Sequence, residues 1–135
     1  MVIPHWYRHG MAELPLVIAL CADLMMRSRI ESGLAIAGYR LRVVGGPTRL
    51  AEALADETPA CIIIDLEAGD DAIATIERLR TDAATRGIPL AAFAGHTQEH
   101  LLDAARAAGA DPVVARGQVA AGTGKVVAAA IAACV

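Results

Sequence analysis

The chain has 135 residues, a formal net charge of −3 and a composition that is 56% hydrophobic but only 3% aromatic. This length suits one domain with a core of aliphatic side chains. The slightly acidic balance gives no reason to expect nucleic-acid binding, and no apolar run approaches the roughly 18 residues of a membrane span. Three cysteines without a CxxC pair indicate reduced thiols and a cytoplasmic location.

Apolar runs alternate with helical patterns along the chain. Residues 1–14 are expected to form an extension, in which Trp6 and Tyr7 would belong to a loose tail or to an aromatic anchor for a partner. Residues 15–135 would form the domain. Strands are expected over residues 16–20, 39–44, 60–65, 88–94 and 112–115. A helical segment follows each of them, the last over residues 119–133.

Polar residues and glycines indicate where these helices begin and end. Asp23 is predicted to cap the first helix, which would bury Met26, Ile30, Leu34 and Ala37 on one face. Gly38 is expected to end that helix. In the same way, Thr97 is predicted to cap the helix that begins after the fourth strand.

Five strand–helix units without a long linker predict an α/β fold with a doubly wound, five-stranded parallel sheet between two layers of helices. The apolar run Cys61-Ile62-Ile63-Ile64 ends on Asp65, as expected for a buried parallel strand. Because functional sites of such sheets lie at the carboxyl ends of the strands, Asp65 is the first candidate site residue.

Several segments carry a family resemblance: residues 16–39, residues 60–65, Ile88-Pro89-Leu90 and residues 108–111, which read Ala-Gly-Ala-Asp. In this order and spacing they resemble a response-regulator receiver domain of the chemotaxis-regulator type, over residues 15–134. The resemblance implies a flavodoxin-like fold with strand order 2-1-3-4-5. It also implies that Asp65 matches the aspartate that receivers phosphorylate.

The chain departs from the receiver pattern at the positions that carry the chemistry. Cys21 and Ala22 stand where receivers place an acidic pair for Mg²⁺, and a thiol and a methyl group cannot supply the oxygen ligands that Mg²⁺ requires. Ala94 replaces the hydroxyl residue at the end of strand four. Arg116 replaces a lysine and is expected to pair with Asp65 through two parallel hydrogen bonds.

Three other patterns allow alternative sites. Cys21 would be a redox-sensitive thiol if Arg116 and the following helix start lowered its pKa, or else a small buried apolar residue. The segment His96-Thr97-Gln98-Glu99-His100 fits the H-x-x-E-H zinc pattern but has no glutamate downstream as a third ligand. The segment Gly122-Thr123-Gly124-Lys125 lacks the first glycine and the hydroxyl residue of a phosphate loop. Its glycines are expected to delay the start of the last helix to about Thr123.

The C-terminal segment is expected to lie in an interface. Residues 126–135 carry no charged or hydroxyl side chain, and a helix that is apolar all round is usually buried. Either the N-terminal extension or a second subunit would cover it. Because receivers commonly dimerise through this surface, the resemblance implies a homodimer.

The sequence therefore favours an atypical receiver, or pseudo-receiver, that is not an enzyme and holds no metal or cofactor. It would act as a protein-interaction module in two-component signalling, with a kinase or another regulator as partner. One alternative is a functional single-domain response regulator in a phosphorelay, phosphorylated at Asp65, with Asp23 and Glu67 as makeshift metal ligands. The other is a flavodoxin-like module that binds a cofactor or small molecule.

Overall fold

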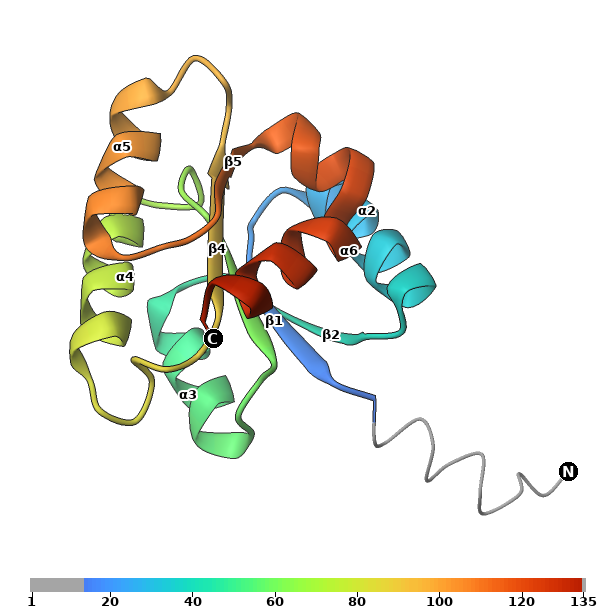
Figure 1. Cartoon of the computed structure of the whole chain (residues 1–135), viewed down its shortest axis with the longest axis horizontal. Coiled ribbons are helices and arrows are strands. Elements are labelled where there is room, and N and C mark those ends of the chain that lie inside the picture. The colour runs from blue at the N-terminus through green and yellow to red at the C-terminus, as the bar shows by residue number, and fades with distance from the viewer. Residues whose placement is uncertain (1–13, 135) are drawn as a thin grey trace, which may run out of the picture.

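The computed structural model describes residues 14–134, which form a parallel sheet flanked by two layers of helices (Figure 1). The extension predicted for residues 1–14 lies outside the described residues except for Leu14. In chain order the elements are β1 (Leu16–Leu20), α2 (Leu24–Ala37), β2 (Arg40–Val44), α3 (Pro47–Asp56), β3 (Cys61–Asp65), α4 (Ala72–Thr81), β4 (Leu90–Ala94), α5 (Glu99–Ala108), β5 (Val113–Ala115) and α6 (Arg116–Ala133).

The five strands lie in the order β2-β1-β3-β4-β5, as expected, and all four strand pairs are parallel. β1, β3 and β4 are buried along their whole length, whereas β2 exposes one side as an edge strand. β4 begins two residues later than predicted. Pro89 accepts a hydrogen bond from Ile62 (2.8 Å) but has no N–H with which to continue the ladder.

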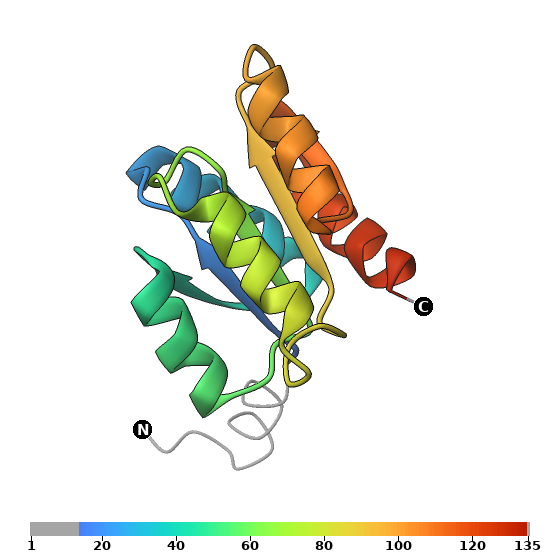
Figure 2. The same cartoon turned by 90° about the vertical axis from the view of Figure 1, so that its left-hand side faces the viewer.

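Alternate strand residues divide the core into two halves, one on each face of the sheet. Val17 and Ile63 pack with α2 and α6, and Ile18 and Ile62 pack under the helices of the other face. Figure 2 shows α3, α4 and α5 side by side on that second face. Burial of these aliphatic side chains is the main force that holds the layers together.

Helices α2 and α6 approach each other closely, and this contact places the start of α6 beside the start of α2. A side-chain Cβ at Gly33 would lie 2.8 Å from Oγ1 of Thr123, and one at Gly124 would lie 2.8 Å from the Cβ of Ala37. The prediction that Ala37 is buried was wrong. Ala37 is exposed, because it lies at the rim of the contact between α2 and α6. Both close approaches require glycine.

The two predicted starts of the late helices were wrong. Thr97 does not cap α5, because residues 95–98 form a turn in which Gln98 N–H donates to Gly95 (2.9 Å). α6 begins at Arg116, three residues earlier than predicted, since the Gln118 side chain accepts a hydrogen bond from the Ala115 N–H (3.0 Å). Gly122 only kinks the helix instead of delaying its start.

The C-terminal half of α6 is not covered on all sides by residues 14–134. Val126, Val127 and Ala130 are buried, whereas alanines at 128, 129, 132 and 133 are exposed. An alanine face presents little apolar area to water, so this helix is stable with one side in solvent. The homodimer through this surface stays a prediction. Among residues 14–134 there is no helix with the length and hydrophobicity needed to span a lipid bilayer.

Candidate functional site at the carboxyl edge of the sheet

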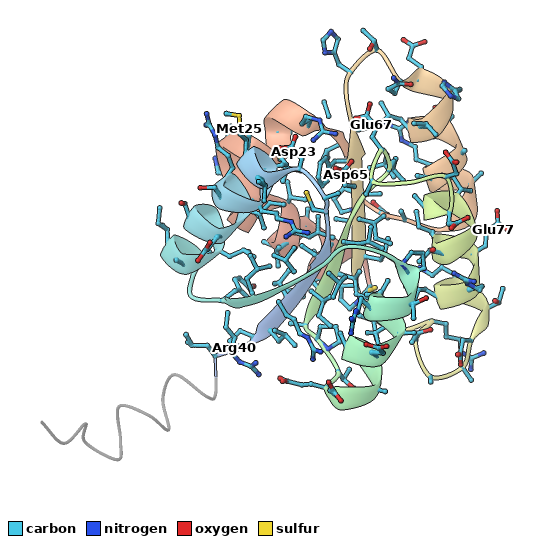
Figure 3. All side chains as sticks on the ribbon, turned by 180° about the vertical axis from the view of Figure 1, so that it is seen from behind. Asp23, Met25, Arg40, Asp65, Glu67 and Glu77 are labelled. Atoms are coloured by element: carbon cyan, nitrogen blue, oxygen red, sulfur yellow. The ribbon has the colours of Figure 1, made fainter. Side chains whose placement is uncertain are left out.

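Asp65 ends β3 at the carboxyl edge of the sheet, and only 2% of the residue is exposed. Its Oδ1 accepts a hydrogen bond from the Glu67 N–H (2.9 Å), and its carbonyl accepts one from the Ala68 N–H (3.1 Å). Such a turn is typical of aspartate after a strand. Figure 3 shows Asp65 near Asp23 and Glu67 at one end of the molecule, with Arg40 at the other end.

Arg116, the first residue of α6, brings its guanidinium group into this cluster. Its Nη2 lies 2.6 Å from Oε2 of Glu67 and 3.2 Å from Oδ1 of Asp65. The group also lies over the Phe93 ring, 5.3 Å from its centroid, in a cation–π contact. The predicted proximity of Arg116 and Asp65 is therefore found. The predicted pair of parallel hydrogen bonds was wrong, because Asp65 receives only one guanidinium nitrogen and shares it with Glu67.

Glu67 is the principal partner of Arg116, a role that the sequence did not reveal. Its Oε2 accepts a hydrogen bond from Arg116 and another from the Gly95 N–H (3.0 Å), which joins the loop after β3 to the loop after β4. These two bonds lower the pKa of the Glu67 carboxyl, and the three surrounding carboxylates raise the pKa of Arg116 against the effect of its partial burial. Glu67 and Arg116 are therefore both charged at neutral pH.

Asp23 caps α2 as predicted and completes the charge cluster. Its Oδ1 accepts hydrogen bonds from the N–H groups of Met25 (2.9 Å) and Met26 (3.3 Å). Its Oδ2 lies 3.7 Å from Nη1 of Arg116, which is an ion pair but too long for a hydrogen bond. One cation, the Arg116 guanidinium, is thus shared by three carboxylates: one from the loop after β1, one at the end of β3 and one in the loop after β3.

Cys21 lies directly under this cluster, with its Sγ 3.8 Å from Oδ2 of Asp65. Burial raises the pKa of the Cys21 thiol, and the Asp65 and Asp23 carboxylates raise it further, against a hydrogen bond to the Asp23 backbone. The expectation that Arg116 and the helix start would lower this pKa was wrong, because the nearest charges are negative. Cys21 is a fully buried member of the core, and a protonated thiol is a poor nucleophile.

The residues at this edge do not fit a divalent cation. Cys21 and Ala22 follow β1 where oxygen ligands would be needed, with the first buried and the second exposed. Ala94 is buried at the end of β4 and offers no hydroxyl group. The makeshift set of Asp23, Asp65 and Glu67 converges on Arg116, and residues 14–134 contain no group of three His, Cys, Asp or Glu side chains arranged to hold a metal. His96 and His100 belong to no such group either.

The structure is similar to solved receiver domains. It matches the signal receiver domain of a histidine kinase from Syntrophus aciditrophicus with a TM-score of 0.77 and 16% identity, over 88% of this chain and 91% of that one. It matches NtrX from Brucella abortus with a TM-score of 0.76 and 16% identity, over 90% of this chain but 27% of NtrX. A protein assigned as a response regulator in Chloroflexus aurantiacus gives a TM-score of 0.74 and 19% identity, over 86% of this chain and 99% of that one.

No protein-family model matches the sequence, and a search of curated proteins found no match. The structural likeness therefore defines the fold: this chain has the fold of response-regulator receiver domains, with the strand order that the sequence resemblance implied.

Proposed function

We propose that this chain is an atypical receiver domain that acts as a protein-interaction module in bacterial two-component signalling, without Mg²⁺-dependent phosphorylation. The observation that carries this proposal is the Arg116 guanidinium, which lies among Asp23, Asp65 and Glu67 where a phosphorylation site would need a metal. Phosphoryl transfer depends on metal ions that neutralise the developing charge. Here Cys21 and Ala22 replace the acidic pair that would bind one.

The charge cluster also supports a fixed rather than a switched state. Arg116 ties α6 to the loops after β3 and β4, and its charge is already balanced by Glu67 and Asp65. Nη2 of Arg116 already donates to both carboxylates, so the guanidinium charge is paired before any phosphoryl group is added. Nη1 has no hydrogen-bond partner among the described residues and lies 3.7 Å from Oδ2 of Asp23. The domain would act through binding alone, as an adaptor that associates with a kinase or a regulator and has no catalytic activity of its own.

A partner surface next to the cluster supports the interaction role. Leu24 and Met25, in the first turn of α2, are 76% and 74% exposed. Beside them a groove of about 500 Å³ runs between the N-terminal ends of α2 and α6. Met25 and Ala120 contribute apolar surface to it, and polar groups come from Asp23, Arg29, His96 and Arg116. Large exposed apolar side chains that gather around a groove are typical of protein-binding sites. A kinase or regulator would dock here through a surface that combines apolar and polar side chains.

Treatment with acetyl phosphate and Mg²⁺, followed by intact-mass measurement, tests the proposal. The wild-type chain and the Asp65→Asn variant are expected to keep their unmodified masses under conditions that phosphorylate an ordinary receiver. A labile adduct with the mass of one phosphoryl group, present in the wild type and absent from Asp65→Asn, would instead identify a functional single-domain response regulator.

A further inference from the structure

The Glu67 carboxylate occupies a small cradle formed by two hydrogen-bond donors. The Gly95 N–H lies 3.0 Å from Oε2 of Glu67, and Nη2 of Arg116 lies 2.6 Å from the same oxygen. Nη2 lies 3.2 Å from Oδ1 of Asp65 as well. A backbone N–H beside a guanidinium group is a donor set that binds carboxylates and phosphates. Any anion attached to Asp65 that used both donors would have to take the place of this carboxylate.

We propose that Glu67 is a built-in anion that takes the place of a phosphoryl group beside Asp65 and holds the loops after β3 and β4 in one arrangement. This inference rests on the proposed function and adds the device that replaces phosphorylation. The loop after β3 supplies the anion, the loop after β4 supplies the Gly95 N–H, and α6 supplies Arg116. The three elements are joined without any modification of Asp65.

Two properties make Glu67 an effective resident anion. It is tethered two residues from Asp65, so its local concentration is far higher than that of a free anion in solution. Its pKa is lowered by the bonds to Arg116 and Gly95, so it stays charged in the neutral range. Free phosphate should therefore not displace it from the wild-type cradle.

Residue-resolved amide exchange of the full chain, measured by NMR at fixed pH and ionic strength, tests this assignment. In Glu67→Ala, the Gly95 amide is expected to exchange about tenfold faster than in the wild type, since a hydrogen bond to a charged acceptor is lost. Inorganic phosphate should restore slow exchange in Glu67→Ala, whereas chloride at equal ionic strength should not. Glu77→Ala is the matched control, because it removes an exposed carboxylate on α4, far from Asp65 (Figure 3).

Glu67→Gln separates charge from shape. It keeps an oxygen that can accept from the Gly95 N–H but loses the charge that binds Arg116, so Gly95 exchange should fall between the wild type and Glu67→Ala. Unchanged Gly95 exchange in Glu67→Ala would overturn the proposal. So would a phosphate effect no larger than that of chloride, or an equal phosphate effect in Glu77→Ala, because the cradle would then not be an anion site.

These outcomes are distinct from those that test the proposed function. A phosphoryl adduct on Asp65 of the wild type would overturn the proposed function whatever the exchange data show. A wild type without an adduct, combined with a Glu67→Ala variant that ignores phosphate, would leave the interaction module in place and remove Glu67 as its resident anion.

Discussion

The two ends of the sheet use arginines in different ways. At the amino edge Arg40 pairs with Glu57, and nearby Arg42 lies 3.0 Å from Asp56; all four side chains are at least one-third exposed. At the carboxyl edge the side chain of Arg116 is 30% exposed, and the side chain of its partner Asp65 is only 3% exposed. The first kind of pair is surrounded by water and contributes little, whereas the second compensates a buried charge. Ion pairs of similar length thus make different contributions to the stability of the fold.

The largest effect is expected from removing the charge of Arg116. Arg116→Met keeps an apolar stem over Phe93 but leaves the buried Asp65 without its cation. This should lower the free energy of unfolding by about 2 kcal/mol, less than for a fully buried pair because Arg116 is partly hydrated. Urea denaturation measures the loss. The matched variant Arg42→Met should lose less than about 1 kcal/mol, and equal losses in the two variants would erase the contrast between the edges.

A smaller effect is expected when the positive charge is kept and only the geometry of the charged group changes. Arg116→Lys replaces a planar fork by a single ammonium group, which cannot serve Glu67 and Asp65 while also lying flat over Phe93. The loss should be about 1 kcal/mol, whereas Arg42→Lys at the exposed pair should change stability by only a few tenths of a kcal/mol. A neutral Arg116→Lys would mean that charge alone holds the cluster together.

The sequence predicted some parts of the fold and of the carboxyl-edge site. The continuous apolar runs that end at Leu20 and Asp65 located the central strands, because burial on both faces leaves no room for polar residues. The expected proximity of Arg116 to Asp65 came from the family resemblance, in which Arg116 stands at the position of the lysine after the fifth strand. The strand order came from the family resemblance rather than from periodicity.

The parts that escaped prediction depend on loop conformation. The role of Glu67 requires the turn at Asp65 to aim the next acidic side chain at Gly95 and Arg116, and no periodicity encodes that direction. The start of α6 depends on one side-chain bond from Gln118 to the Ala115 backbone. An acidic residue two positions after a strand-ending aspartate was the available signal for Glu67.

The pH dependence of stability sharpens the comparison further. The folded-state pKa of Glu67 is lowered, first by Arg116 and then by Gly95, from an ordinary value of 4.5. Its contribution to stability is therefore complete above about pH 4.5 and is lost as the pH falls through the lower folded-state pKa. Between pH 7 and pH 3 the unfolding free energy of the wild type should fall more steeply than that of Glu67→Gln. Glu77→Gln should follow the wild type more closely, and parallel curves for both glutamine variants would contradict a special role for Glu67.

The smallest effect is expected from Asp65→Asn, although Asp65 is the most buried member of the cluster. The asparagine Oδ1 can still accept from the Glu67 N–H and from Arg116, and Arg116 keeps Glu67 as its charged partner. Loss of one charge–charge contact is offset by the lower cost of burying a neutral group, so stability should change by less than about 1 kcal/mol in either direction. Urea denaturation of Asp65→Asn and of Arg116→Met under the same conditions measures the two changes in unfolding free energy. A loss as large as that of Arg116→Met would make Asp65, and not Glu67, the carboxylate that fixes Arg116.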